Sequence, residues 1–440
     1  MRFLWTEGVT PPEKEPLSGN IRADVLVIGG GLAGVLCAAE LQARGADVVL
    51  AEADELGAGI TKGTTAVLSA QHDTLYSDIT ERYGWNAARQ YLRANLLALE
   101  DFRAAAKEID CDFSTRPSLM YSLPGEKQID LNNEAETLHI LGYSAKYTQN
   151  TPLPFAVAEA IIYPDMAEFH PLKFLYAKAK DLRCYTHTRV LDLKGTTAIT
   201  DRGTVEAKSV IVATHFPFID RRGLYFLKMY QKRSYVVAYR GAADFGCTAV
   251  GAGEGLYFRN YRDLLLIGGG DCRTGRKSNA FAAIGAFAAR HFPHAAEVCR
   301  WANQDCITLD GIPYIGQYSK AFPGVFVATG FGLWGMTTSM AASKILADAV
   351  EGKENPNAAV FAPGRSLLHG QLFRNIGVTL ADFLILTGKR CPHLGCALRY
   401  NKQEHSWDCP CHGSRFETDG TLIDNPADRN ARVPRNRQGH

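Results

Sequence analysis

Two short boxes of cysteine and histidine near the C-terminus constrain this chain more than any other feature. The first box holds Cys391 and His393, and the second holds Cys409 and His412, in the pattern C-x-H-x15-C-x-x-H. Two thiolates and two imidazoles in that order suit a [2Fe–2S] cluster with sulfur ligands on one iron and nitrogen ligands on the other. A structural zinc site is the alternative, but such sites usually pair two cysteines first and two histidines later.

The boxes CPHLGC and CPCHGS resemble those of Rieske iron–sulfur proteins of the respiratory cytochrome bc kind. The resemblance implies cluster ligands, a disulfide between the two loops and a serine hydroxyl that donates to cluster sulfur. The ligands would be Cys391, His393, Cys409 and His412, the disulfide Cys396–Cys411, and the serine Ser414. High-potential members carry a tyrosine two residues after that serine, where this chain has Phe416. The chain lacks the D-x2-H-x4-H run that a Rieske oxygenase needs for its mononuclear iron.

A second pattern lies near the N-terminus, where an apolar run leads into a glycine-rich turn and an alanine-rich helical segment. Gly29, Gly31 and Gly34 form G-x-G-x-x-G, and a second apolar run ends at Glu52, 18 residues after the last glycine. This order predicts a βαβ unit whose turn approaches a dinucleotide pyrophosphate and whose acid holds ribose hydroxyls. A glycine-rich turn in an ordinary α/β domain is the alternative.

Further stretches resemble the D-amino-acid-oxidase-like flavoproteins. Residues 57–66 are similar to the second flavin loop of that family, 309–316 to its DGxPxIG strand entry, and 325–336 to the glycine-rich start of a helix expected over 337–350. The resemblance covers roughly residues 22–356 and implies FAD as the cofactor. The residues implied to bind FAD are Gly29, Gly31, Ala33, Gly34, Glu52, Thr61, Thr64, Thr65, Val190, Ala213, Gly330, Gly332, Trp334, Gly335 and Met336.

The order of the two patterns resembles a bacterial family of FAD-dependent oxidoreductases with a C-terminal Rieske domain. We therefore expect an α/β protein with a Rossmann-type FAD-binding domain, an interleaved antiparallel-sheet substrate domain and a small, truncated all-β Rieske lobe. The expected FAD-binding segments are about 20–90, 155–220 and 305–356, the substrate segments about 91–154 and 221–304, the linker 357–372 and the Rieske domain 373–440. So small a lobe buries little apolar surface, so we expect it to depend on metal, disulfide and docking.

The composition is that of an ordinary globular protein, with 46% apolar residues, 21% charged residues and a net charge of +2. This charge gives no sign of a nucleic-acid partner. The longest apolar stretches are shorter than the ~20 residues of a membrane span, so we expect none. The first twenty residues show no signal-peptide core, which favours the cytoplasm. A disulfide would be unusual there.

The expected activity is dehydrogenation of a small molecule, an amine or an alcohol, by hydride transfer to FAD. Single electrons would then pass to the cluster and on to an external acceptor. An NAD(P)H-dependent reductase is one alternative, although the only other candidate fingerprint, from Gly268, has Arg273 in place of its last glycine. A non-enzymatic electron carrier is another, and it predicts no cavity beside the flavin.

Several side chains are candidates for contact with the substrate or with a redox partner, and each has an alternative explanation without a function. Trp334 follows the flavin glycines, and Gln71 and His72 follow the second flavin loop; packing is the alternative for these three. Arg259, between Tyr257 and Tyr261, is a candidate ligand for a substrate carboxylate, with a solvated face as the alternative. The tail arginines are candidates for attracting an acidic redox partner, with a solvated tail as the alternative: Arg429, Arg432, Arg435 and Arg437.

Overall fold

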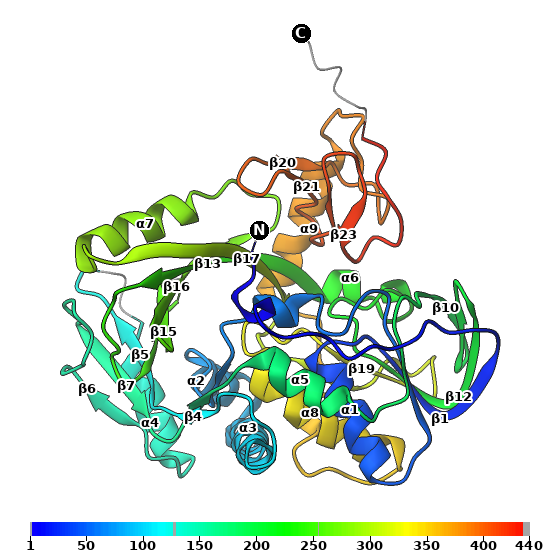
Figure 1. The fold of residues 1–440 in the computed structure, drawn as a ribbon, viewed down its shortest axis with the longest axis horizontal. Helices are drawn as coiled ribbons and strands as arrows, with labels where there is room; N and C mark the ends of the chain where they lie inside the picture. Colours follow the sequence, from blue (N-terminus) through cyan, green and yellow to red (C-terminus); the bar gives the residue numbers. More distant parts are fainter. Residues whose placement is uncertain (1, 126–128, 254, 434–440) are drawn as a thin grey trace.

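Two eight-stranded sheets form the body of the protein, and a small four-stranded sheet forms a lobe at its C-terminal end (Figure 1). The computed structural model describes residues 2–125, 129–253 and 255–433. We call residues 2–365 the body and residues 389–433 the C-terminal lobe.

The first sheet is built around β1 (Ile21–Ile28), which pairs in parallel with β2 (Val48–Ala51) and β12 (Gly203–Val212). Its second half is buried, as is usual for a parallel strand covered on both faces. The crossover from β1 to β2 is α1 (Leu32–Ala43), which packs against α8 (Gly335–Val350). The remaining strands are β9 (Cys184–Tyr185), β10 (Val190–Lys194), β11 (Thr197–Thr200), β18 (Tyr314–Gln317) and β19 (Val325–Thr329).

The second sheet has the order β17-β13-β16-β15-β14-β5-β7-β6 and is antiparallel except where β14 meets β5. Its strands are β5 (Ser118–Ser122), β6 (Lys146–Thr148), β7 (Glu159–Tyr163), β13 (Met229–Arg240), β14 (Thr248–Gly251), β15 (Tyr257–Tyr261), β16 (Leu264–Arg273) and β17 (Ala296–Thr308). The expected boundary at residue 155 is wrong at this point, because β7 pairs with β5 and so belongs to the second sheet.

Helices fill the space beside the two sheets. They are α2 (Leu75–Tyr83), α3 (Trp85–Ala106), α4 (Leu131–Ile140), α5 (Pro171–Ala179), α6 (Tyr225–Lys228) and α7 (Ala280–His291). Short 3-10 turns occur at η1 (Leu4–Thr6), η2 (Ile60–Gly63), η3 (Asp220–Gly223) and η4 (Ala359–Phe361), and a small third sheet joins β3 (Val67–Leu68), β4 (Ser114–Thr115) and β8 (Ala167–Glu168). Within the described ranges, every helix is too short or too polar to cross a membrane.

The segment expected as a linker, 357–372, is packed rather than free. Phe361 is fully buried, and the Arg365 guanidinium pairs with the Asp310 carboxylate at 2.9 Å. An additional helix, α9 (Gly370–Phe383), begins inside this segment. The prolines and glycines of the segment favoured a connection, and the helix after them was not predicted.

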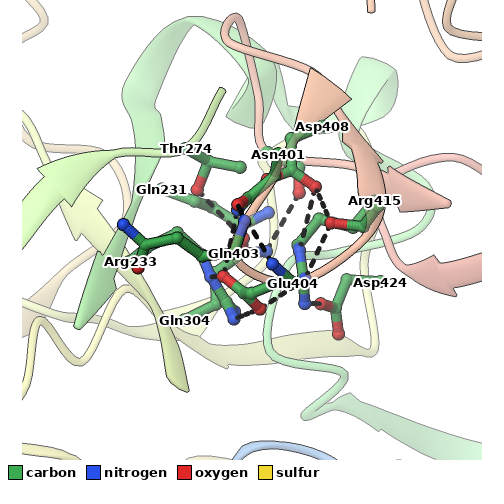
Figure 2. A network of polar contacts seen from close by, with 12 residues as sticks. Gln231, Arg233, Thr274, Gln304, Asn401, Gln403, Glu404, Asp408, Arg415 and Asp424 are labelled. Atoms are coloured by element: carbon green, nitrogen blue, oxygen red, sulfur yellow. Dashed lines mark hydrogen bonds and ion pairs between the residues drawn. The ribbon is translucent and has the colours of Figure 1, made fainter. Parts of the chain in front are cut away.

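The C-terminal lobe holds β20 (Arg399–Asn401), β21 (Ser406–Asp408), β22 (Arg415–Phe416) and β23 (Leu422–Asp424) in one antiparallel sheet. Its core is small and is formed largely by the four box cysteines with Leu398 and Phe416. Buried polar contacts add to it. The Arg415 guanidinium binds Glu404, Asp408 and Asp424, and Glu404 also pairs with Arg233 of the body (Figure 2). The lobe is therefore fixed to the second sheet by charge-paired and hydrogen-bonded groups.

Candidate functional site

A cavity of about 880 Å³ runs between the two sheets of the body. The residues implied to bind FAD gather on its wall, although they come from six separate parts of the chain. Thirteen of the fifteen line the cavity: Gly29, Gly31, Ala33, Glu52, Thr61, Thr64, Thr65, Val190, Ala213, Gly332, Trp334, Gly335 and Met336.

Gly34 and Gly330 are not among the residues that line the cavity, so their contact with the cofactor stays a prediction. A Cβ on Gly34 would lie 1.9 Å from the Gly29 carbonyl oxygen, so this glycine lets α1 pack against the turn. A Cβ on Gly330 would lie 2.3 Å from Cγ2 of Thr308. Both glycines permit close packing of the loops that line the cavity.

The turn before α1 has the features of a phosphate cradle. Gly29 has a φ of +112°, and a Cβ there would lie 2.6 Å from the Ala213 carbonyl oxygen. The Thr61 hydroxyl accepts from the Leu32 amide at 3.1 Å, so the second loop closes on the start of the helix. The open backbone and the helix N-terminus at the cavity wall fit a dinucleotide pyrophosphate.

Glu52 lies at the end of β2, where the ribose acid of such folds is expected. Its carboxylate accepts from the Gly30 amide at 2.5 Å and from the Asp54 amide at 2.8 Å. Burial raises the pKa of Glu52, and these backbone donors oppose the rise. The structure thus shows a carboxylate held in place at the cavity wall, where it can accept from ribose hydroxyls.

The far end of the cavity, beneath the second sheet, is acidic. Asp73, Asp271 and Asp305 line it together with Tyr257 and Trp334. The Trp334 indole forms a hydrogen bond with Asp73, and burial raises the pKa of Asp73 to about 7. Burial, and then the nearby charge of Asp271, raise the pKa of Asp305 to about 7. Sequence reasoning missed these carboxylates because they are scattered over more than 230 positions with no motif around them.

His72 was selected as a candidate, but its neighbour Asp73 is the residue that lines the cavity. The His72 ring is fully packed: Nδ1 contacts the Tyr91 hydroxyl at 2.8 Å and Nε2 the Ser69 carbonyl oxygen at 2.9 Å. It stacks on the Trp334 ring at a centroid distance of 4.9 Å. Burial lowers the pKa of His72 to about 3, so the ring is neutral and supports Trp334 from behind. Gln71 is fully buried as well, which fits the packing alternative for both residues.

Arg259 is a corrected prediction. It is 1% exposed, so the solvated-face alternative is wrong. Its guanidinium pairs with Glu168 at 3.2 Å and donates to the carbonyl oxygens of Thr65, Ala66 and Phe169. These contacts engage the side chain in holding the second flavin loop, so it does not serve as a carboxylate ligand. The adjacent tyrosines are also packed, and only Tyr257 lines the cavity.

The four implied cluster ligands come together in the C-terminal lobe. Cys391, His393, Cys409 and His412 are between 1% and 8% exposed, and the two imidazole rings lie 5.0 Å apart. In the described part of the chain, neither Nδ1 atom has a hydrogen-bond partner although both are buried. Burial lowers the pKa of His412 to about 4, which favours the neutral, metal-binding form. Two buried thiols and two unpartnered ring nitrogens fit a [2Fe–2S] cluster.

The implied disulfide is not formed in this structure, where all four box cysteines are free thiols. The sulfurs of Cys396, Cys409 and Cys411 lie within 4.8 Å of one another. A disulfide requires about 2.05 Å between sulfurs, so the bond stays a prediction. The Ser414 hydroxyl is fully buried, accepts from the Ala427 amide at 2.9 Å and forms a hydrogen bond with Cys391.

The tips of both boxes face the body rather than solvent. His393 Nε2 contacts the Asp220 carboxylate at 2.8 Å, and Arg221 donates to the His393 carbonyl oxygen at 2.9 Å. Arg273 donates to the carbonyl oxygens of Pro410 and Cys411 at 2.7 and 2.8 Å. Arg273 is also the residue that interrupts the second G-x-G-x-x-G. No motif marked the other contacts, which join positions more than 130 residues apart.

A short chain of contacts leads from the cavity wall to the second box. His215 lines the cavity, and its Nε2 atom lies 3.2 Å from Gln231 Oε1. The Gln231 amide nitrogen donates to the His412 carbonyl oxygen at 2.7 Å. Asn425 of the lobe donates to the carbonyl oxygens of Thr214 and Phe216, so the backbone on each side of His215 is held by the lobe. Gln231 thus bridges the cavity and the cluster ligands.

The described tail arginines, Arg429 and Arg432, are exposed. Arg435 and Arg437 lie outside the described residues.

The lobe allows a prediction about the cluster potential. Each donor to cluster sulfur stabilises the reduced form, and Phe416 is buried among the cysteines where a tyrosine would add one donor. We expect Phe416→Tyr to raise the potential and Ser414→Ala to lower it, each by roughly 60–130 mV for one charge-assisted hydrogen bond. Protein-film voltammetry measures both. A Phe416→Tyr variant with an unchanged or lower potential would show that residue 416 does not face cluster sulfur.

Comparisons with known proteins agree with this geometry. The chain matches the family described as FAD dependent oxidoreductase over residues 24–349 and the Rieske [2Fe-2S] domain over residues 374–435. A Bacillus subtilis protein, YhfW, named as a Rieske 2Fe-2S iron-sulfur protein, is 31% identical over 96% of this chain and 95% of its own length. The gamma-glutamylputrescine oxidoreductase of Escherichia coli is 24% identical over 77% of this chain and 86% of its own.

The fold is also that of a solved structure. The crystal structure of glycine oxidase from Geobacillus kaustophilus superposes with a TM-score of 0.67 at 22% identity, covering 78% of this chain and 99% of that one.

Proposed function

Because this chain belongs to the family of FAD-dependent oxidoreductases of the D-amino-acid-oxidase type and carries a C-terminal Rieske domain, we propose that it oxidises a small amine. Its cofactors are FAD and a [2Fe–2S] cluster. Bound FAD supplies two-electron oxidation of a C–H bond, and the cluster supplies a one-electron outlet to an external acceptor. The chain's own residues bind and orient the substrate and connect the two cofactor sites.

The acidic end of the cavity is the observation that carries this proposal. Carboxylates at Asp73, Asp271 and Asp305 would attract a cationic amine to the wall opposite the flavin loops. Two arginines that line the cavity, Arg233 and Arg259, are each paired with a glutamate, and the charge of Lys232 acts on Asp73 and lowers its pKa. An amine therefore fits better than an alcohol or a simple carboxylate. The names of two relatives, a glycine oxidase and a gamma-glutamylputrescine oxidoreductase, point to nitrogen-bearing substrates as well.

The contacts between His215, Gln231 and His412 support electron transfer from the flavin site to the cluster. Electron transfer slows steeply with distance, and one side chain joins the two sites by hydrogen bonds. Asp220 and Arg221 orient His393 at the first box. In this arrangement the body holds both histidine ligands at its surface while the lobe covers them.

The two alternative functions find less support. The run from Gly268 to Arg273 lies inside β16, an antiparallel strand, and not at a strand-to-helix turn of the kind that binds a nicotinamide nucleotide. A simple electron carrier has no need of a cavity that continues past the flavin loops to Tyr257 and Asp271.

The test is anaerobic reduction of the holoprotein by a panel of mono- and diamines, amino acids, alcohols, NADH and NADPH. We expect amines to bleach the flavin absorbance first and the cluster absorbance afterwards. Bleaching by NADH or NADPH at turnover rates of about 1–1000 per second would overturn the proposal in favour of a reductase.

The acidic residues also give a prediction about pH. Asp73 and Asp305 have pKa values of about 7, so each is protonated and neutral below pH 7 and anionic above it. We expect KM for a cationic amine to fall as the pH rises through about 7. Loss of one charge-assisted contact costs about 1.5–3 kcal/mol, so Asp73→Asn should raise KM at pH 8 by roughly 10–100-fold. Asp263→Asn, a surface control, should leave the profile unchanged. A wild-type KM that rises over this range would contradict the cationic substrate.

A further inference from the structure

Helix α9 buries polar side chains and exposes apolar ones. Its only buried residues are polar, Asn375 and Asp382, whereas large apolar side chains point outward. Of the 17 exposed large hydrophobic residues in the described chain, seven fall in this helix and its flanks: Leu368, Phe373, Ile376, Leu380, Phe383, Leu384 and Leu386. Exposed apolar residues are ordinary when scattered, but a contiguous group marks a contact surface. We call these seven residues the apolar face.

The two buried polar groups explain why the helix holds this orientation. Asn375 Oδ1 accepts from Arg273 at 2.8 Å, and Arg273 also holds the second box. The Asp382 carboxylate accepts from Arg399 at 3.0 Å and from the Cys411 thiol at 3.8 Å. The polar side of α9 is thus used to attach the helix to the cluster region. The apolar side is left outward by the same contacts.

The segment that carries the apolar face has basic residues at its surface and no exposed acid. Between residues 365 and 390 the single acid is Asp382, and it is buried and paired. The basic residues there include Arg374, which is exposed, and Lys389 and Arg390, which are partly exposed. An apolar stripe of Phe and Leu with basic residues at its margin is typical of helices that lie flat in the interface of an anionic membrane, and α9 itself contributes one of these basic residues, Arg374.

We propose that the apolar face of α9 docks this protein onto the surface of an anionic lipid bilayer. At 14 residues the helix is about 21 Å long, too short to span the roughly 30 Å hydrocarbon core, so it would lie along the surface. Positive charge at the margin complements anionic headgroups. If two copies of the chain instead paired symmetrically through the apolar face, Arg374 of one copy would approach Arg374 of the other, and the two positive charges would repel each other.

Docking through the apolar face would also bring one side of the cluster region close to the membrane. Both histidine tips are covered by the body, whereas α9 touches the cluster region through Asp382 and through Phe383, which lies beside Gly395. A bilayer against α9 would place the cluster region close to the membrane surface. The external acceptor would then be a membrane-associated electron carrier. This inference concerns location and does not depend on which substrate is oxidised.

The experiment is sedimentation of the holoprotein with vesicles of phosphatidylcholine alone and of equal parts phosphatidylcholine and phosphatidylglycerol. We expect binding to the anionic vesicles that weakens as salt is added. The double variant Phe373→Ser/Leu380→Ser should bind at least about tenfold more weakly, and Arg374→Glu should weaken binding to anionic vesicles. A matched control, Leu97→Ser/Ile140→Ser, removes apolar residues that are 50% and 59% exposed elsewhere and should bind like the wild type.

Three results would overturn the proposal. The holoprotein could fail to bind anionic vesicles, or the double variant could bind as well as the wild type. Alternatively, sedimentation equilibrium without lipid could show a dimer that the double variant disperses, which would make the apolar face a contact between copies. The cluster and flavin absorbance of each variant, measured beforehand, verifies that the substitutions leave the fold intact.

Discussion

We expect His412→Ala and Cys391→Ser to yield protein that keeps its FAD but loses its iron. The box residues do not line the flavin cavity, although lobe residues between Arg415 and Asp428 contribute to its wall, so removing one ligand should empty the cluster site alone. Iron should fall from about two atoms per chain to near zero, because a two-iron cluster needs all four protein ligands. Metal analysis, acid-labile sulfide and flavin absorbance measure this directly.

A cysteine outside the boxes provides the control. Cys272→Ser changes a partly exposed thiol on β16 and should retain both cofactors. In the two ligand variants, substrate should still bleach the flavin, while electron delivery to an acceptor that depends on the cluster should stop. Stoichiometric zinc in wild-type protein purified without air would refute the iron–sulfur assignment. Loss of FAD together with iron would refute the independence of the two sites.

The second large effect is expected at the ion pair that fastens the lobe to the body. Arg233 and Glu404 are each 3% exposed, and Arg233 Nε donates to Glu404 at 3.0 Å (Figure 2). Removing one partner of a buried pair costs about 3–5 kcal/mol, and Arg415, which also binds Glu404, places Arg233→Ala at the lower end. We expect a less stable, partly undocked lobe and slow reduction of the cluster after the flavin is reduced. Thermal unfolding and stopped-flow absorbance measure the two effects.

The same strand offers a matched control. Arg240 pairs with Asp263 at the surface, where the two side chains are 60% and 62% exposed. Such exposed pairs contribute about 0–1 kcal/mol, so Arg240→Ala should change neither the unfolding temperature nor the rate of cluster reduction appreciably. Equal effects of the two variants would show that the buried pair does not hold the lobe in place.

Sequence reasoning was strongest where chemistry requires a fixed local spacing. The fingerprint from Gly29 to Glu52 predicted β1, α1 and β2, and the spacing of the two boxes predicted a clustered set of cysteines and histidines. In both cases the cofactor constrains neighbouring positions along the chain, so the pattern can be read from the residues alone.

It was weakest where function depends on side chains brought together by the fold. The cavity carboxylates and the bridge at Gln231 have no motif: Asp271, Asp305 and Gln231 are placed by strand pairing between distant segments, and Asp73 lies in the loop before α2. Arg259 was misread because its sequence neighbourhood says nothing about Glu168, which is 91 residues away and pairs with it. The helix α9 was missed because the prolines and glycines around its start favoured a connection, although its apolar residues follow a helical spacing.

The edge of the second sheet that supports the lobe also forms the cavity wall. Successive residues of a strand point to opposite faces, and β17 places Gln304 against the lobe and Asp305 toward the cavity. A single layer of backbone therefore separates the cavity from the residues that hold the C-terminal lobe. An engineer who moved the lobe onto another flavoprotein would have to move this wall with it. Similarly, substitutions in this wall that are selected for a new substrate would also alter the contacts that hold the C-terminal lobe.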